Sequence, residues 1–257
     1  MALPDSRKAL LWSAFFVFWA VGFPVLADHC ARPGAGEPVA SRQVIDGDTL
    51  DLVDGRRVRL IGINAPEIGR RGSPSEPYAQ TARRELQRLA TEKGLRLLVG
   101  REPKDKYGRT LGHLFDARGA NVEARLLEQG LGFAVGIAPN LQLLDCHLRI
   151  EREARLGRRG LWKHAPVGQA EQLGGGGFRI LRGRVARVSR TDSHIWMDLE
   201  GPLTLRLPPA LIEPREDGDW LRREVEVRGW IVDRGAVGSG RKRYMLPVDD
   251  LRLMRRD

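Results

Sequence analysis

The stretch from Val44 to Glu67 constrains the fold of this chain more than any other. Its sequence, VIDGDTLDLVDGRRVRLIGINAPE, contains two runs of strand-forming residues with Asp54-Gly55 between them. An Asp-Gly pair in that position is a strong hairpin signal, because glycine accepts a positive φ. The triplet Asp46-Gly47-Asp48 interrupts the first strand, and Asn64-Ala65-Pro66-Glu67 ends the second with a stiff turn. The stretch therefore predicts a hairpin with polar groups gathered at one end.

Oxygen-bearing side chains dominate that end of the predicted hairpin. Folded back, the chain would place Asp46, Asp48, Asn64 and Glu67 near one another, with Arg59 alongside. Carboxylate and amide oxygens suit a hard cation such as Ca²⁺ or Mg²⁺, and an arginine fork suits a phosphate. An Asp-Gly-Asp triplet by itself is more often a turn than a metal site, so a purely structural role is the alternative.

The order of motifs along the chain resembles that of the staphylococcal-nuclease family. The hairpin carries D-G-D-T, R-L-x-G-I and N-A-P-E in succession, and a second block follows at Asp105-Lys106-Tyr107-Gly108-Arg109. Leu126–Leu131 resembles the family's next helix, and His147–Arg149 and Gly160–Trp162 fall where the family closes its last helix. The resemblance extends over residues 42–163 and implies an OB-fold barrel with helices packed on it.

The resemblance also implies an activity, which is metal-assisted hydrolysis of phosphodiester bonds in DNA and RNA with Ca²⁺ as the cofactor. It assigns the cation to Asp46, Asp48 and Asn64. Glu67 would act as the general base, or at least orient the attacking water. The cation would polarise the phosphate and position that water.

Two arginines and their neighbours complete the expected site. Arg59 and Arg109 would stabilise the negative charge that grows on the phosphoryl oxygens in the transition state. Tyr107 and Lys106 would contact the nucleotide. Without the hairpin, Arg109 would be interpreted as a solvated surface arginine and Tyr107 as a half-buried aromatic residue.

Two positions depart from the family pattern. Well-known members have an aspartate where this chain has Asn64, so one negative ligand becomes a neutral carbonyl. Calcium affinity follows ligand charge, so we expect weaker Ca²⁺ binding, or a preference for Mg²⁺ or Mn²⁺. The family's tyrosines after the Gln-Gly-Leu helix are replaced by Gly132–Gly136, which puts base stacking at that edge in doubt.

The composition favours an anionic partner. The net charge is +10, from 43 Lys and Arg against 33 Asp and Glu. Such a balance suits nucleic acid or an anionic membrane surface. Arginine-rich proteins without a nucleic-acid role also exist, so the charge only supports the motif argument.

The front of the chain predicts export. Residues 1–27 combine Arg7-Lys8, an apolar run and small residues at Val25-Leu26-Ala27, which is typical of a signal peptide. An uncleaved membrane anchor is the alternative, because the run approaches the length that spans a bilayer. We therefore expect a periplasmic or secreted protein whose residues 28–41 form an exported N-terminal segment. In an oxidising compartment Cys30 and Cys146 could form a disulfide, and two unpaired thiols are the alternative.

Helical and strand patterns fill the rest of a first domain, expected at residues 42–164. Apolar spacing predicts a helix at Tyr78–Glu92, a helix at Val122–Glu128 and a last helix opened by Pro139-Asn140. Strands are expected at Leu95–Val99 and Arg109–Phe115. Residues 165–177 end in four glycines and read as a flexible linker.

Residues 178–257 predict a second, β-rich domain. Short strands are expected at 179–189, 195–199, 203–207, 224–232, 244–247 and 251–254, with a short helix or loop at 211–221. Such a series suggests a small open barrel of OB-like type. Nucleic acid could contact it through Arg241-Lys242-Arg243-Tyr244, Trp230 and Trp196. The alternative is a solvated hairpin tip with core tryptophans.

The expected fold class is therefore α+β and mainly β, with an OB-fold nuclease barrel followed by an OB-like barrel. The expected function is that of an exported, metal-dependent endonuclease acting on DNA, RNA or both. A noncatalytic nucleic-acid binder and a cell-envelope interaction protein on a nuclease-derived fold are the alternatives. A general base opposite two arginines argues against both, because a binder has no need of one.

Overall fold

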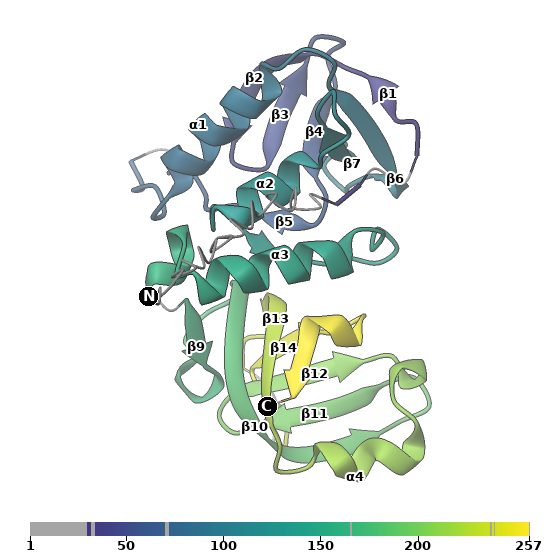
Figure 1. The fold of residues 1–257 in the computed structure, drawn as a ribbon. Helices are drawn as coiled ribbons and strands as arrows, with labels where there is room; N and C mark the ends of the chain where they lie inside the picture. The colour runs from purple at the N-terminus through teal and green to yellow at the C-terminus, as the bar shows by residue number, and fades with distance from the viewer. Residues whose placement is uncertain are drawn as a thin grey trace, which may run out of the picture.

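The computed structural model describes residues 30–31, 34–69, 72–164, 166–236, 238 and 240–256. The predicted signal segment at residues 1–27 lies outside these residues. Within them, no helix combines the length and the apolar character that crossing a membrane requires. The described chain forms two sheet-based units with helix α3 (Leu144–Leu156) between them (Figure 1).

The first unit is a curled six-stranded sheet in the order β1-β6-β7-β4-β3-β2. Strands β4 and β7 are parallel and the other neighbours are antiparallel. The strands are β1 (Glu37–Pro38), β2 (Ser41–Asp46), β3 (Thr49–Leu52), β4 (Arg57–Leu60), β6 (Arg96–Lys104) and β7 (Thr110–Phe115). A separate two-stranded pair joins β5 (Ile63–Asn64) to β8 (Phe133–Ala134).

The Asp-Gly-Asp triplet is a turn between two strands, so the prediction of one interrupted strand was wrong. Strands β2 and β3 pair with each other, and Asp46 lies opposite Thr49 across the turn. The backbone N–H of Asp48 donates to Asp46 Oδ1 at 3.1 Å, which satisfies the turn locally. Gly47 is required there because a Cβ atom would lie 2.6 Å from the Cβ atoms of both Ala65 and Ala82.

Helices cover the curled sheet largely where the apolar spacing predicts them. Helix α1 (Ala79–Ala90) buries Ala79, Ala82, Leu86, Leu89 and Ala90, and α2 spans Val122–Glu128. The last helix, α3, begins at Leu144 and not at Pro139-Asn140. The segment before it is fixed as a loop, because the Asn140 side chain bonds the backbone N–H and C=O of Glu102, each at 3.0 Å.

The second unit is a closed barrel of five strands, where the sequence predicts an open one. Strand β10 is 14 residues long, and it pairs with β13 along its first part and with β11 along its second. The remaining neighbours run β11-β12-β14-β13, which closes the ring. The barrel strands are β10 (Gly177–Arg190), β11 (Ile195–Leu199), β12 (Leu203–Leu207), β13 (Glu224–Asp233) and β14 (Tyr244–Pro247).

The two units share one strand topology. In the first unit, β2, β3 and β4 form an antiparallel meander, β7 lies parallel beside β4, and β6, the fourth strand, lies beside β7. In the second unit, β10, β11 and β12 form the meander, β14 lies parallel beside β12, and β13, the fourth strand, lies beside β14. A helix precedes the fourth strand in both, α1 in the first and α4 (Asp217–Trp220) in the second. This arrangement agrees with the five-stranded Greek-key barrel of OB-type folds.

Two segments of the second unit differ from the sequence predictions. Val167–Gln169, within the expected flexible linker, forms β9 and pairs in parallel with β10. The expected strand at 251–254 is a 3₁₀ turn at Leu251–Leu253 followed by β15 (Met254–Arg256). The Asp250 carboxylate accepts a hydrogen bond from the Arg252 N–H, which favours the turn over an extended start.

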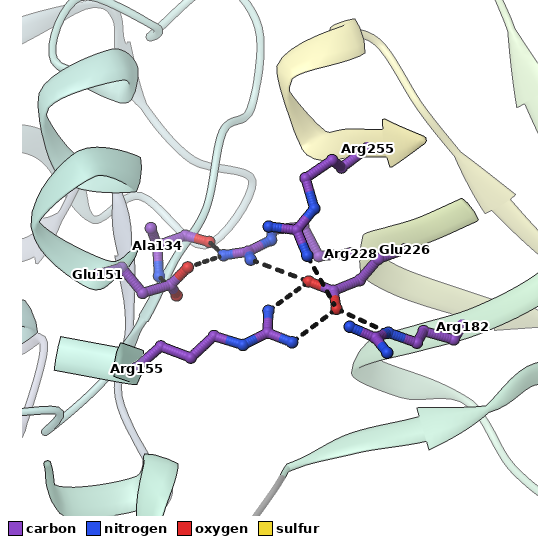
Figure 2. Close-up of polar contacts among 7 residues, drawn as sticks. All are labelled: Ala134, Glu151, Arg155, Arg182, Glu226, Arg228 and Arg255. Carbon is purple, nitrogen blue, oxygen red and sulfur yellow. Dashed lines mark hydrogen bonds and ion pairs between the residues drawn. The ribbon is translucent and has the colours of Figure 1, made fainter. Parts of the chain in front are cut away.

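Covalent and ionic contacts hold α3 to its surroundings. Cys146 on α3 forms a disulfide with Cys30, with the Cα atoms 5.7 Å apart. On the side of the barrel, Arg155 donates two hydrogen bonds to Glu226, at 2.6 and 2.8 Å (Figure 2). A small apolar cluster of Ala154, Trp162 and Ile180 joins the two units beside this pair.

Candidate active site

A cavity of about 1240 Å³ opens on the first unit, and all eight residues predicted for the site line it. They come from the β2–β3 turn, strand β4, the end of β5, the segment after it and the β6–β7 turn. The eight are Asp46, Asp48, Arg59, Asn64, Glu67, Lys106, Tyr107 and Arg109. Segments up to 63 positions apart in the sequence therefore contribute to one concave surface.

The Asp48 carboxylate makes polar contacts with several neighbouring residues. Its Oδ2 accepts a hydrogen bond from the Ala65 N–H at 2.7 Å and lies 3.1 Å from Arg59 Nη2, and its Oδ1 accepts from Thr49 Oγ1 at 3.0 Å. Burial raises the pKa of Asp48 to about 7, with Arg59 acting to lower it and the neighbouring Asp46 to raise it. A positive charge beside these carboxylates would offset the cost of their burial.

Arg59 is directed inward by the backbone around it. Its Nη1 donates to the carbonyl oxygens of Leu60 and Ile63, at 2.6 and 2.9 Å. Its Nη2 approaches Asn64 Oδ1 at 3.4 Å as well as Asp48. The guanidinium therefore links the β2–β3 turn to strand β5.

Asn64 and Glu67 are positioned by pairings outside the hairpin. Asn64 lies on β5 opposite Phe133 of β8. Glu67 donates its N–H to Glu76 Oε2 at 2.8 Å, and its carbonyl accepts the Glu76 N–H at 3.0 Å. The Glu67 residue is exposed at the cavity, which suits a group that exchanges a proton with water.

The β6–β7 turn presents the second arginine. Asp105 Oδ2 accepts from Arg109 Nε at 2.6 Å, which fixes the guanidinium on one edge. The Arg109 and Lys106 side chains lie 5.7 and 5.0 Å from the centre of the Tyr107 ring. Tyr107 is 73% exposed, so it is a surface group and not a half-buried one.

The oxygen donors at the β2–β3 turn fit a hard divalent cation. Two neighbouring buried carboxylates, Asp46 and Asp48, and the amide oxygen of Asn64 are the ligand types that Ca²⁺, Mg²⁺ and Mn²⁺ take in proteins. Among the described residues, no three or more His, Cys, Asp or Glu side chains are grouped so that they could hold a metal ion by themselves.

The structure also places residues that sequence reasoning did not select. Glu76, Lys104 and Trp230 line the cavity. No local motif marks Glu76 or Lys104. Trp230 was considered only as part of a separate surface with Tyr244, and Tyr244 is 3% exposed in the barrel core. The prediction of a surface role for Tyr244 was therefore wrong.

Comparison with known proteins places this part of the chain in a family. Residues 57–164 match the model of the staphylococcal nuclease homologue family. The chain is 34% identical to a thermonuclease of Staphylococcus intermedius over 131 residues, covering 50% of this chain and 77% of that protein. It is 30% identical to a thermonuclease of Staphylococcus hyicus over 125 residues, covering 48% and 73%. An uncharacterized endonuclease of Escherichia coli O157:H7 is 30% identical over 129 residues, covering 48% and 75%.

An OB-type barrel with these relatives defines a nuclease-type protein. More narrowly, the chain belongs to the staphylococcal nuclease homologue family. The family match ends at residue 164, before the first strand of the five-stranded barrel at Gly177.

Proposed function

We propose that this protein is an exported, metal-dependent endonuclease that hydrolyses phosphodiester bonds of DNA, RNA or both. One observation carries the proposal, which is the convergence of two buried carboxylates, an exposed carboxylate and two arginines on one cavity. That set contains a cation site, a base and two donors for phosphoryl oxygens.

Asp46, Asp48 and Asn64 would hold the cation, with Ca²⁺ as the expected ion and Mg²⁺ or Mn²⁺ as alternatives. When bound, such an ion supplies Lewis-acid polarisation of a phosphate oxygen. The neutral amide of Asn64 keeps the ligand charge low, which favours weaker Ca²⁺ binding than three carboxylates would give.

The protein's own side chains would do the remaining work. Glu67 accepts a proton from the attacking water, since it is an exposed carboxylate of the cavity, three positions after Asn64 in the chain. Arg109 donates to nonbridging phosphate oxygens while Asp105 holds its Nε in place. Arg59 exchanges its contact with Asp48 for a phosphate oxygen when substrate enters, which keeps the guanidinium paired in both states.

Export is supported by the bond between Cys30 and Cys146. Disulfides persist in oxidising compartments and are rare where glutathione keeps thiols reduced. We propose a periplasmic or secreted location, with anchoring by the first 27 residues as the alternative.

The test is a plasmid-cleavage assay with the purified protein, with Ca²⁺, Mg²⁺ or Mn²⁺ added singly and with excess chelator. We expect cleavage with at least one cation and none with chelator. Asp48→Asn should abolish cleavage, whereas Asp54→Asn, in the exposed β3–β4 turn, should leave it unchanged. Full cleavage in excess chelator would contradict the metal dependence.

A further inference from the structure

Strand β13 carries one residue of the barrel into the cavity of the first unit. Val225, Val227 and Ile231 face the barrel core, so the alternate residues Glu226, Arg228 and Trp230 face outward. Of the barrel's described residues, Trp230 is the one that lines the cavity with the candidate catalytic groups. Its side chain belongs to the exposed large apolar groups of the described residues, with 36% of the residue's surface accessible.

Ionic contacts fix this strand against the first unit. Arg228 donates to the Ala134 carbonyl oxygen at 3.1 Å and to the Glu151 carboxylate, and Glu151 Oε1 accepts the Ala134 N–H at 2.7 Å (Figure 2). Ala134 belongs to β8, whose partner strand β5 ends in Asn64. The same contacts therefore hold both Trp230 and the strand that carries a candidate metal ligand.

A row of aromatic rings orients Trp230. Its ring lies 5.2 Å from that of Phe178 in an edge-to-face contact, and Phe178 stacks on Phe133 at 5.7 Å. Phe133 makes an edge-to-face contact with Trp162 at 5.5 Å. Such a row packs one side of the tryptophan and leaves a fixed exposed surface at the cavity.

The cavity has the chemistry of a site for a nucleic-acid strand. Lys104 and Arg109 line it and can pair with phosphates, and Tyr107 and Trp230 present two exposed aromatic surfaces. Bases stack on such rings whatever their sequence, because every base has a π face. A stacking position in the barrel would extend the substrate site beyond the unit that matches the nuclease family.

We propose that Trp230 stacks on a base of the strand bound in the cavity, so that the C-terminal barrel forms one wall of the substrate site. This inference depends on the proposed function insofar as the occupant is a nucleic acid. Trp230 takes no part in the chemistry. Its role is to bind and position the strand.

The test measures binding of a fluorescein-labelled, single-stranded thymidine decanucleotide by anisotropy, in excess chelator so that no cleavage occurs. Trp230→Ala should weaken binding roughly 5- to 150-fold, which is the range for loss of one stacked base. Trp230→Phe should restore most of the affinity. Val232→Ala is the matched control, because Val232 belongs to the same strand, is 43% exposed, lies outside the cavity and should have no effect.

A second probe separates stacking from a structural effect. With an abasic decanucleotide of the same length, the parent and Trp230→Ala should bind equally weakly, since the base that stacks is missing. In the cleavage assay Trp230→Ala should raise KM and leave kcat unchanged. Circular dichroism of the variants checks their folding.

Several results would overturn the inference. Equal binding of the thymidine strand by the parent and folded Trp230→Ala would exclude stacking, even in an active nuclease. The same loss on the abasic strand would assign Trp230 a structural role. A parent that does not bind the decanucleotide at micromolar concentrations would refute it together with the nucleic-acid substrate. Weakened binding by Trp230→Ala without any cleavage by the parent would refute the proposed catalysis and support the inference.

Discussion

Glu226→Gln removes a buried carboxylate that several arginines share where the two units meet. Arg155 on α3 and Arg182 on β10 bond it directly, at 2.6 and 3.2 Å for their shortest distances. Arg228 on β13 and Arg255 on β15 lie 4.0 and 3.7 Å away. Glutamine keeps the shape and the acceptor oxygen, so the substitution removes mainly the charge.

The pKa of Glu226 sets the size of the effect. Burial alone would raise it, but the hydrogen bonds and charges of Arg155, Arg255 and Arg182 outweigh burial and lower it from 4.5 to about 2. Each pKa unit corresponds to about 1.4 kcal/mol, so the charged form stabilises the folded state by about 3 kcal/mol. Because the folded pKa is the lower one, this stabilisation is complete above pH 4.5 and is lost as the pH falls toward 2.

Urea denaturation followed by tryptophan fluorescence, at several pH values between 7 and 3, tests this. Glu226→Gln should lower the free energy of unfolding by about 3 kcal/mol at pH 7, and the difference should shrink below pH 4.5. Glu153→Gln is the matched control, because Glu153 is an exposed α3 carboxylate paired with Arg149 at 3.4 Å. It should cost no more than about 0.5 kcal/mol. A loss for Glu226→Gln that is the same at every pH would refute the reasoning.

Three further predictions concern the first unit. Replacing both Cys30 and Cys146 with serine opens a loop whose ends are 116 residues apart. Urea denaturation should show that the free energy of unfolding falls by roughly 2–5 kcal/mol, and adding reductant to the variant should not lower it further. Asn64→Asp should tighten Ca²⁺ binding, measured by calorimetric titration, because it adds a negative ligand; unchanged or weaker binding would remove Asn64 from the cation site. Burial, together with the neighbouring His113, lowers the pKa of His147 from 6.5 to about 3. Between these two pH values His147 is therefore protonated in the unfolded chain and neutral in the folded one. Stability should therefore fall with acidification in this window, and His147→Gln should reduce the slope by about 1.4 kcal/mol per pH unit; an unchanged slope would contradict the shifted pKa.

The local elements of the first unit could be predicted because their signals are local. The apolar spacing in Ala79–Ala90 and the Asp54-Gly55 pair each specify structure within a few residues. The Asp46–Asp48 turn was mistaken for an interruption, since the apolar residues on both sides suit one strand as well as two. The start of α3 depended on a tertiary bond from Asn140 to Glu102, 38 positions earlier, which no window of sequence contains.

The second unit was harder to predict, because the alternation of apolar and polar residues along a strand does not show which face will lie inside a closed barrel. Tyr244 and Trp230 both follow a nonaromatic residue, and the local sequence does not distinguish them. Tyr244 nevertheless packs in the barrel core, whereas Trp230 faces the cavity. Which face is inside follows from the ring that β10 and β13 close. The contact of Arg155 with Glu226, 71 positions apart, follows from the same closure, and arginine is too frequent in this chain for its partner to be guessed.

The turnover of Glu67→Gln tests the central claim most directly. Glutamine keeps the shape of the side chain and removes the base, so kcat for plasmid cleavage should fall about 10²- to 10⁴-fold. Affinity for the thymidine decanucleotide in chelator should stay within a few-fold of the parent, because most of it comes from cationic groups. Glu92→Gln, after α1 and outside the cavity, is the control and should cleave as the parent does. A folded Glu67→Gln protein with the parent's turnover would contradict the account.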